Sequence, residues 1–143
     1  MKLKQISIFL ENRPGHLGAA CRKIADAGLN VETMILADTE NFGILRFLVK
    51  DWKRGVDICT ELGLVTKVTE VIAVSASDSP GGLAMLLEAL SKTSVNIEYM
   101  YGFNTHTKND AIIILRLDKP DEGLAALKDA NFRILSEEDI FAK

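Results

Sequence analysis

The sequence predicts an α+β fold made of two βαββαβ units in tandem, and three observations support this prediction. The segment ISIFLENRPGHLG at residues 6–18 returns as IAVSASDSPGGLA 66 positions later. Both copies pass from an alternating apolar segment through Pro-Gly into apolar residues at helical spacing. The chain of 143 residues is long enough for two small units of about 70 residues each. We therefore expect one unit at residues 1–70 and the other at residues 71–143.

The composition is typical of a soluble globular protein. Hydrophobic residues make up 48% of the chain, charged residues make up 26%, and the net charge is −3. The slightly acidic balance, with scattered basic residues, argues against nucleic acid as a partner. The amino-terminal segment lacks the apolar core of a secretory signal, and the longest apolar run, residues 111–115, cannot span a membrane. We therefore expect a cytoplasmic protein with no membrane partner.

The cysteines and histidines do not form a metal-binding pattern. Cys21 and Cys59 belong to no CxxC motif, so we expect free thiols in a reducing compartment. His16 and His106 lack the carboxylate or cysteine neighbours of a metal site. The sequence therefore predicts neither a metal nor a cofactor.

The first copy gives each element of a βαββαβ unit in order. Residues 2–10 alternate polar with apolar side chains, which predicts a half-buried strand. The turn at residues 12–15 leads into a helix, because Asn is a good cap and Pro suits a first helical turn. Gly28 ends that helix. The remaining strands are expected at residues 29–36, 44–50 and 64–69, and the second helix at residues 53–62.

The second copy repeats this order. After Pro80-Gly81, apolar residues recur at the spacing of the first helix. Its later strands are expected at residues 95–101, 111–117 and 132–136, and its second helix at residues 121–130. No linker separates the copies, because the last strand of the first runs directly into the first strand of the second. Two helices on one face of a four-stranded antiparallel sheet define a ferredoxin-like unit.

The loop between the first strand and the first helix carries the candidate chemistry in both copies. Gly15 and Gly81 have no Cβ, so another molecule can approach the backbone closely. The first helical N–H groups beyond them have no intrahelical acceptor and carry partial positive charge, which suits a carboxylate. Asn12 and Asp78 supply oxygens that can accept hydrogen bonds from an ammonium group. This combination suits a free α-amino acid.

A purely structural role for the same residues is the alternative. An Asx residue followed by Pro-Gly also makes a good turn and helix cap. A constraint of the fold could retain it in both copies, so the residues alone leave both interpretations open. Asn30 and Asn96 are expected to open the second strand of each copy and could contribute another amide.

The segment ENRPGHLGAACRKIADAGLNVETM resembles an ACT domain, the amino-acid-sensing module of metabolic enzymes and regulators. It is especially similar to the version at the end of phosphoglycerate dehydrogenases, where the loop reads H-x-N-x-P-G and a later Asn-Ile opens the second strand. The resemblance covers essentially the whole chain as two ACT domains in tandem. It implies that domains align edge strand to edge strand into one eight-stranded sheet. An amino acid would then lie between the loop of one domain and the second strand of its neighbour.

The resemblance also implies a set of ligand-binding residues in each copy. In the first copy these are Asn12, Gly15, His16, Leu17 and Asn30. In the second copy they are Asp78, Gly81, Gly82, Leu83 and Asn96.

Two departures from the family pattern affect these sites. Leu10 and Ala76 replace the leading His of the motif, so one polar contact is missing in both copies. Asp78 and Ser79 stand where the first copy has an Asn and an Arg. These departures put the serine specificity of that version in doubt and suggest that the two sites differ.

The function implied by the resemblance is regulation rather than catalysis, and the sequence contains no catalytic constellation. We expect the protein to sense a free amino acid at the interface of paired ACT domains and to modulate a partner enzyme of amino acid metabolism. An exposed sheet edge or helical face could pair two chains into a homodimer. The alternative is a non-catalytic regulatory subunit of an amino acid biosynthetic enzyme such as acetolactate synthase.

Overall fold

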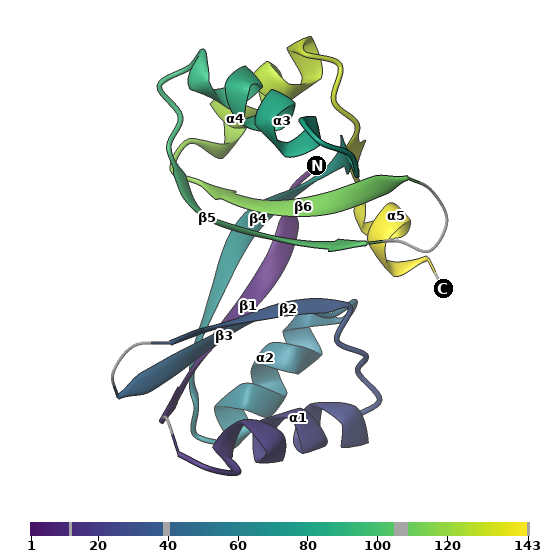
Figure 1. The fold of residues 1–143 in the computed structure, drawn as a ribbon. Helices are drawn as coiled ribbons and strands as arrows, with labels where there is room; N and C mark the ends of the chain where they lie inside the picture. The colour runs from purple at the N-terminus through teal and green to yellow at the C-terminus, as the bar shows by residue number, and fades with distance from the viewer. Residues whose placement is uncertain (12, 39–40, 105–108, 143) are drawn as a thin grey trace. The chain divides into compact units, whose positions relative to one another are not determined.

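The chain forms two compact α+β units (Figure 1). The structure is a computed structural model that describes residues 1–11, 13–38, 41–104 and 109–142. One unit comprises residues 4–69, and the other comprises residues 70–142 together with residues 1–3. Each unit contains the elements of a βαββαβ fold, with two helices on one face of an antiparallel sheet. The predicted fold class is therefore confirmed.

The unit at residues 4–69 has the strand order β2-β3-β1-β4. Strand β3 pairs antiparallel with both β1 and β2. Alternate residues of β1, namely Ile6, Ile8 and Leu10, face α1 and α2 and form a core with Phe47 of β3. The alternation marks the face that packs under the helices, but the strand is more than half buried, because Gln5 and Ser7 on its other face are also buried. The elements are β1 (Leu3–Glu11), α1 (His16–Asp26), β2 (Thr33–Asp38), β3 (Phe42–Leu48), α2 (Trp52–Glu61) and β4 (Val65–Ser77).

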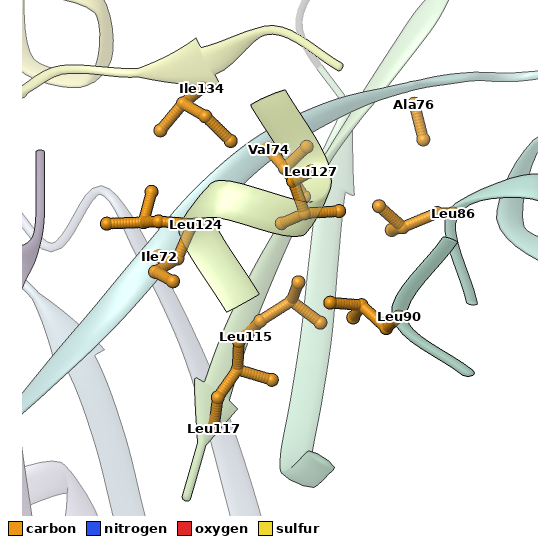
Figure 2. Packing of buried hydrophobic residues seen from close by; sticks show 10 residues of the cluster. All are labelled: Ile72, Val74, Ala76, Leu86, Leu90, Leu115, Leu117, Leu124, Leu127 and Ile134. Atoms are coloured by element: carbon orange, nitrogen blue, oxygen red, sulfur yellow. The ribbon is translucent and has the colours of Figure 1, made fainter. Parts of the chain in front are cut away.

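The unit at residues 70–142 repeats this arrangement with the order β5-β6-β4, and β7 also pairs with β4. Helices α3 and α4 lie on the same face of its sheet (Figure 1). Figure 2 shows the leucines of both helices converging on Ile72 and Val74 of β4 and on Leu115 of β6. The elements are α3 (Gly82–Ser91), β5 (Ile97–Asn104), β6 (Asp110–Leu117), α4 (Pro120–Asp129), β7 (Ile134–Leu135) and α5 (Glu137–Phe141).

Several predicted boundaries were wrong. One continuous strand, β4, replaces the two strands expected at the junction of the copies, so the described residues form seven strands rather than eight. The closing strand expected at residues 132–136 is only Ile134–Leu135, because Ser136 starts the unpredicted helix α5. Strand β2 begins at Thr33 rather than at residue 29. Asn30 and Asn96 therefore precede their strands. The alignment of domains edge to edge stays a prediction.

The duplication extends further along the chain than the loop motif. Gly55 of α2 and Gly123 of α4 occupy the fourth position of their helices, 68 residues apart. A Cβ at Gly55 would lie 2.7 Å from Ile6 Cδ1, and one at Gly123 would lie 2.3 Å from Leu117 Cδ1. Each glycine thus lets the second helix of its unit approach the sheet closely. This pair fixes which positions of α2 and α4 correspond.

Candidate functional site

A glycine in left-handed conformation stands at the start of the first helix in both units. Gly15 has φ 82° and caps α1, whereas Gly81 has φ 91° and caps α3. Neither helix start has a side-chain hydrogen bond at its cap among the described residues. A Cβ built on either glycine would meet nothing within 4 Å. The positive φ therefore accounts for glycine at both positions, and each leaves open space over the helix start.

The loop before α3 leaves two backbone donors free. The Gly82 N–H donates to Ser79 O at 3.0 Å, and the first helical bond runs from Met85 N–H to Gly81 O. Over the described part of the chain, no acceptor is present for the N–H groups of Leu83 and Ala84. These two donors point out of a helix start that carries partial positive charge. They could hold a carboxylate group.

Asp78 adds a carboxylate beside these donors. Its backbone N–H donates to Asn109 O at 2.8 Å, which anchors the loop to the end of the β5–β6 connection. Its side chain is exposed and has no ion-pair partner within the described ranges. The Ser77 and Ser79 hydroxyls hydrogen-bond to one another at 2.7 Å across the same turn. The contact between Asp78 and Asn109 was not predictable from the sequence, because it joins residues far apart in the chain.

Close packing within the protein explains the absence of a side chain at Gly82. A Cβ there would lie 1.9 Å from Ser77 O. Gly82 is buried, so the turn closes tightly on its own strand. The matching position in the first unit is His16, whose side chain is half-buried there. The two loops therefore differ in shape as well as in charge.

The loop before α1 carries cationic and aromatic side chains instead. Arg13 forms an exposed ion pair with Glu11, with Nε and Oε2 3.3 Å apart. His16 Nδ1 lies 3.3 Å from Glu11 O, and the His16 N–H donates to Arg13 O at 3.4 Å. Leu17 packs partly against the core of the unit. Asn12, the side chain expected to accept from an ammonium group, lies outside the described residues, as does His106.

In each unit, the candidate asparagine lies far from the strand–helix loop of the same unit. Asn30 precedes Thr33, which pairs with Leu48, whereas the loop follows Glu11, which pairs with Phe42. The two ends of β3 are about 20 Å apart at the rise of a strand. Asn30 is exposed, and its Nδ2 donates to Glu32 Oε2 at 3.4 Å.

Asn96 occupies the equivalent place in the other unit. Its N–H donates to Asp118 Oδ1 at 2.8 Å, and its carbonyl accepts from the Asp118 N–H at 3.1 Å. The loop of that unit follows Ser77, which pairs with Asp110 at the opposite end of β6. Within one unit, the structure therefore brings the loop residues together but does not bring the asparagine to them.

Leu10 and Ala76 stand where the related motif has a histidine, and their burial explains the difference. Leu10 is 3% exposed and Ala76 is 4% exposed, and both belong to the cores beneath the helices. A polar ring at either place would need a buried hydrogen-bond partner. Both positions therefore serve packing in this chain.

The remaining reactive groups are placed for packing as well. Burial raises the pKa of the Cys59 thiol to about 11, with a smaller contribution from Cys21, so this thiol is protonated at neutral pH.

Across the described ranges, no group of three or more His, Cys, Asp or Glu residues could hold a metal ion. Nor do these ranges contain a helix long and apolar enough to cross a membrane.

The structure defines a tandem α+β protein of two ferredoxin-like units, each with a glycine-capped first helix. The family model described as "ACT domain pair" matches residues 1–142. The chain therefore belongs to the ACT domain pair family, as its loop motif led us to expect. No curated protein matches the chain.

Solved structures agree with this assignment. Protein BT0572 from Bacteroides thetaiotaomicron is 32% identical, with a TM-score of 0.93, and the match covers 100% of this chain and 98% of that one. The regulatory subunit of aspartate kinase from Thermus thermophilus, in a ligand-free form, is 18% identical with a TM-score of 0.65, covering 89% and 91% of the two chains. The regulatory subunit from Thermus flavus is 19% identical with the same TM-score, covering 90% of each chain. The aspartate kinase subunits share the fold of this chain.

Proposed function

We propose that this protein binds a free amino acid at its strand–helix loops and regulates a partner enzyme of amino acid metabolism. The observation that carries the proposal is the loop before α3. It combines two acceptor-free helical N–H groups, those of Leu83 and Ala84, with the exposed carboxylate of Asp78. The donors suit an α-carboxylate, and the acidic side chain suits an α-ammonium group.

A complete site would use residues from two units. Strands β2 and β5 end the strand order of their units and so offer open edges. Antiparallel pairing of two such edges sets the start of one strand against the end of the other. The asparagine that precedes one edge strand would thereby reach the loop end of a neighbouring unit.

Exposed apolar side chains on an edge strand favour such pairing. On β2, Met34 is 54% exposed and Leu36 is 51% exposed. On β5, Met100 occupies the position equivalent to Met34 and is 36% exposed. Apolar side chains exposed along a strand edge are commonly covered by another chain or domain. Tandem domains or a homodimer could supply the partner edge.

Binding across two units would link the ligand to regulation. A ligand that contacts both units stabilises the arrangement in which both contacts are made, which is the minimum requirement for allostery. Regulatory subunits of aspartate kinase have this fold, which supports an enzyme of amino acid metabolism as the partner. The amino acid is the regulatory signal in this proposal, and the chain itself performs no turnover.

A thermal-shift screen of the twenty amino acids tests the proposal. A ligand present at 100 times its Kd should stabilise the folded chain by about 2.7 kcal/mol. Asp78→Ala should remove the shift from the loop before α3, and Asn12→Ala should weaken binding at the loop before α1.

Asp57→Ala provides a matched control, because Asp57 is an exposed carboxylate on α2 and belongs to neither loop. This variant should keep the full ligand-dependent shift. The proposal fails if no amino acid at millimolar concentration moves the unfolding transition of the unmodified chain.

A further inference from the structure

The start of α2 carries three cationic side chains that the amino-acid site does not use. Lys50 precedes the cap residue Asp51, and Lys53 and Arg54 lie in the first turn of the helix. All three side chains are exposed, and these three residues form the basic patch. The patch follows the end of β3 at Leu48, whereas the loop before α1 lies beside the opposite end of that strand, about 20 Å away. The loop chemistry therefore does not account for this surface.

Helix electrostatics do not explain the basic patch. A helix start carries partial positive charge, so acidic side chains stabilise it and basic side chains destabilise it. The first turn of α2, which the structure describes completely, contains no acidic residue. The Asp51 carboxylate before it accepts a hydrogen bond from the Arg54 N–H at 3.2 Å and thereby caps the helix. The cations consequently lower the stability of the helix start.

The cations of the basic patch have few partners within the chain. Among the described residues, Lys50 and Arg54 have no ion pair and no side-chain hydrogen bond. Lys53 Nζ lies 5.7 Å from the centroid of the Trp52 ring. Asp57 has helical spacing from Lys53 and from Arg54, yet within the described helix it pairs with neither. Each cation can therefore pair with an acidic group on another molecule.

The second unit shows that the fold does not require cations at this place. The correspondence of Gly55 with Gly123 aligns the basic patch with three acidic residues, which are Asp118, Asp121 and Glu122. Two of these acids have partners in their own unit. The Asp118 carboxylate accepts a hydrogen bond from the Asn96 N–H at 2.8 Å, and Asp121 Oδ1 lies 3.0 Å from Lys2 Nζ. The charge is therefore reversed at all three positions, and the basic patch belongs to the first unit alone.

We propose that the basic patch binds an acidic segment of the enzyme that this chain regulates. The inference deepens the proposed function and rests on it for the nature of the partner as an enzyme. Carboxylates on the partner would form charge-assisted hydrogen bonds with the two lysines and the arginine. Opposite charges on the two surfaces would also steer their encounter and disfavour partners that lack an acidic segment. Cations that weaken their own helix are expected where a surface serves binding.

A short protein segment suits the basic patch better than a nucleic acid or a membrane. Residues 4–69 contain nine lysines and arginines and eight acidic residues, and the remainder of the chain contains eight and twelve. A nucleic acid would extend beyond the patch onto surface that is neutral or acidic overall, whereas nucleic-acid-binding domains are strongly basic. Binding to anionic lipid typically uses clusters of about four to eight basic residues. Three cations match a short run of carboxylates instead.

Trp52 provides a spectroscopic signal at the basic patch. It is the single tryptophan of the chain, and its ring packs partly against the core of its unit. Lys53 lies over this ring. A carboxylate that pairs with Lys53 would draw the ammonium group away from the ring and change the emission of Trp52. Tryptophan fluorescence therefore reports binding at the patch directly.

Titration of the full chain with a polyglutamate peptide tests the proposal. The anisotropy of a fluorescein label on the peptide gives the affinity, and the Trp52 emission of the unmodified chain should change in step with it. The triple variant Lys50→Glu, Lys53→Glu and Arg54→Glu should bind the peptide at least ten-fold more weakly. Its unfolding temperature should rise, because acidic side chains suit a helix start, so misfolding would not explain the loss of binding.

The triple variant Lys23→Glu, Lys67→Glu and Lys92→Glu is the matched control, because these lysines are exposed and lie outside the basic patch. It has the same net charge as the patch variant and should keep the affinity for polyglutamate within about two-fold. The proposal is overturned if the unmodified chain does not bind polyglutamate at low ionic strength, or if the control loses as much affinity as the patch variant. It is also overturned if oligouridylate RNA or phosphatidylserine vesicles bind more tightly than the peptide.

The thermal-shift screen separates this proposal from the function proposed above. The patch variant should keep the full stabilisation by an amino acid, because the basic patch belongs to neither loop. A chain that binds polyglutamate at the patch but is stabilised by no amino acid would overturn the proposed function and leave the docking surface in place. A chain that is stabilised by an amino acid but does not bind polyglutamate would overturn the docking surface alone.

Discussion

At the scale of single residues, the turn before the first helix is packed differently in the two units. Gly82 is packed against the backbone of Ser77, whereas its counterpart His16 has room for an imidazole ring. Gly15 and Gly81 are retained in both copies because their φ values of 82° and 91° favour glycine. The Pro-Gly motif was therefore a sound predictor of the turn. The tight contact at Gly82 was not predictable, because it depends on how the turn folds back on its own strand.

Gly82→Ala should destabilise the unit at residues 70–142. A methyl group 1.9 Å from Ser77 O forces the turn apart, at an expected cost of about 1–3 kcal/mol. Chemical denaturation followed by circular dichroism measures the change. Gly18→Ala is the matched control, since a Cβ at this exposed helical position meets nothing within 4 Å and should stabilise the chain by about 0.5–1 kcal/mol. Equal effects of the two substitutions would contradict the packing argument.

The two cysteines should react at very different rates in the folded protein. Cys59 is fully buried, and its pKa is raised to about 11, so its thiolate is scarce at pH 7.5. Cys21 is only partly buried. Alkylation with iodoacetamide, followed by mass spectrometry, should label Cys21 first and label Cys59 only after unfolding. Rapid labelling of both thiols under native conditions would show that α2 is not packed as described.

At the scale of elements, the errors of sequence-based prediction have physical causes at helix ends. Strand β2 does not begin at residue 29, because Gly28 adopts φ 78° and the Leu29 N–H donates to Ile24 O at 3.2 Å. Those residues close α1 instead of extending a strand. The helix α5 was missed because it is short and overlaps the expected last strand. Its signal was nevertheless present in Ser136 and Asp139, which form a capping box.

The capping box should make α5 sensitive to acid. The backbone N–H and then the hydroxyl of Ser136 donate to the Asp139 carboxylate, which lowers its pKa below the ordinary value of 3.8. Because the folded pKa is the lower one, this stabilisation is fully present above pH 3.8 and is lost as pH falls through the folded value. When amide exchange at Ile140 is measured from pH 6 to pH 2, it should accelerate, beyond its intrinsic pH dependence, only below pH 3.8.

Asp139→Asn isolates the contribution of the carboxylate to this acid response. The amide cannot ionise, so the extra acceleration at Ile140 should disappear, while its baseline protection at pH 6 should be lower than in the unmodified chain. An unchanged acid profile in this variant would assign the effect to another group.

At the scale of the whole molecule, the sequence predicted the duplication and the fold but not every contact between distant residues. The repeat predicts units at residues 1–70 and 71–143, and in the structure residues 1–3 group by their contacts with residues 70–142. Leu3 is 1% exposed, and Lys2 Nζ lies 3.0 Å from Asp121 Oδ1 on α4. Contacts between residues this far apart in sequence leave no local pattern. The loops of the candidate sites were recognisable from their motif, whereas the position of Asn30 and Asn96 at the opposite ends of the sheets depends on strand pairing, which the motif does not encode.

Leu3→Ala should therefore weaken the unit at residues 70–142 more than the unit at residues 4–69. Removing a fully buried leucine side chain costs about 2–5 kcal/mol. Hydrogen exchange with mass spectrometry should locate the lost protection in peptides of residues 70–142. Met1→Ala is the control, since Met1 is 56% exposed and should change little. Loss of protection confined to residues 4–69 would contradict the division of the chain.

The grouping of residues 1–3 with the carboxyl-terminal half also bears on biosynthesis. During synthesis, residues 1–3 are made before every residue of 70–142 with which they group. The burial of Leu3 and the ion pair of Lys2 with Asp121 therefore form only after α4 has been made. Until then, this short segment has none of those contacts, although the residues that follow it in β1 can already pair within their own unit.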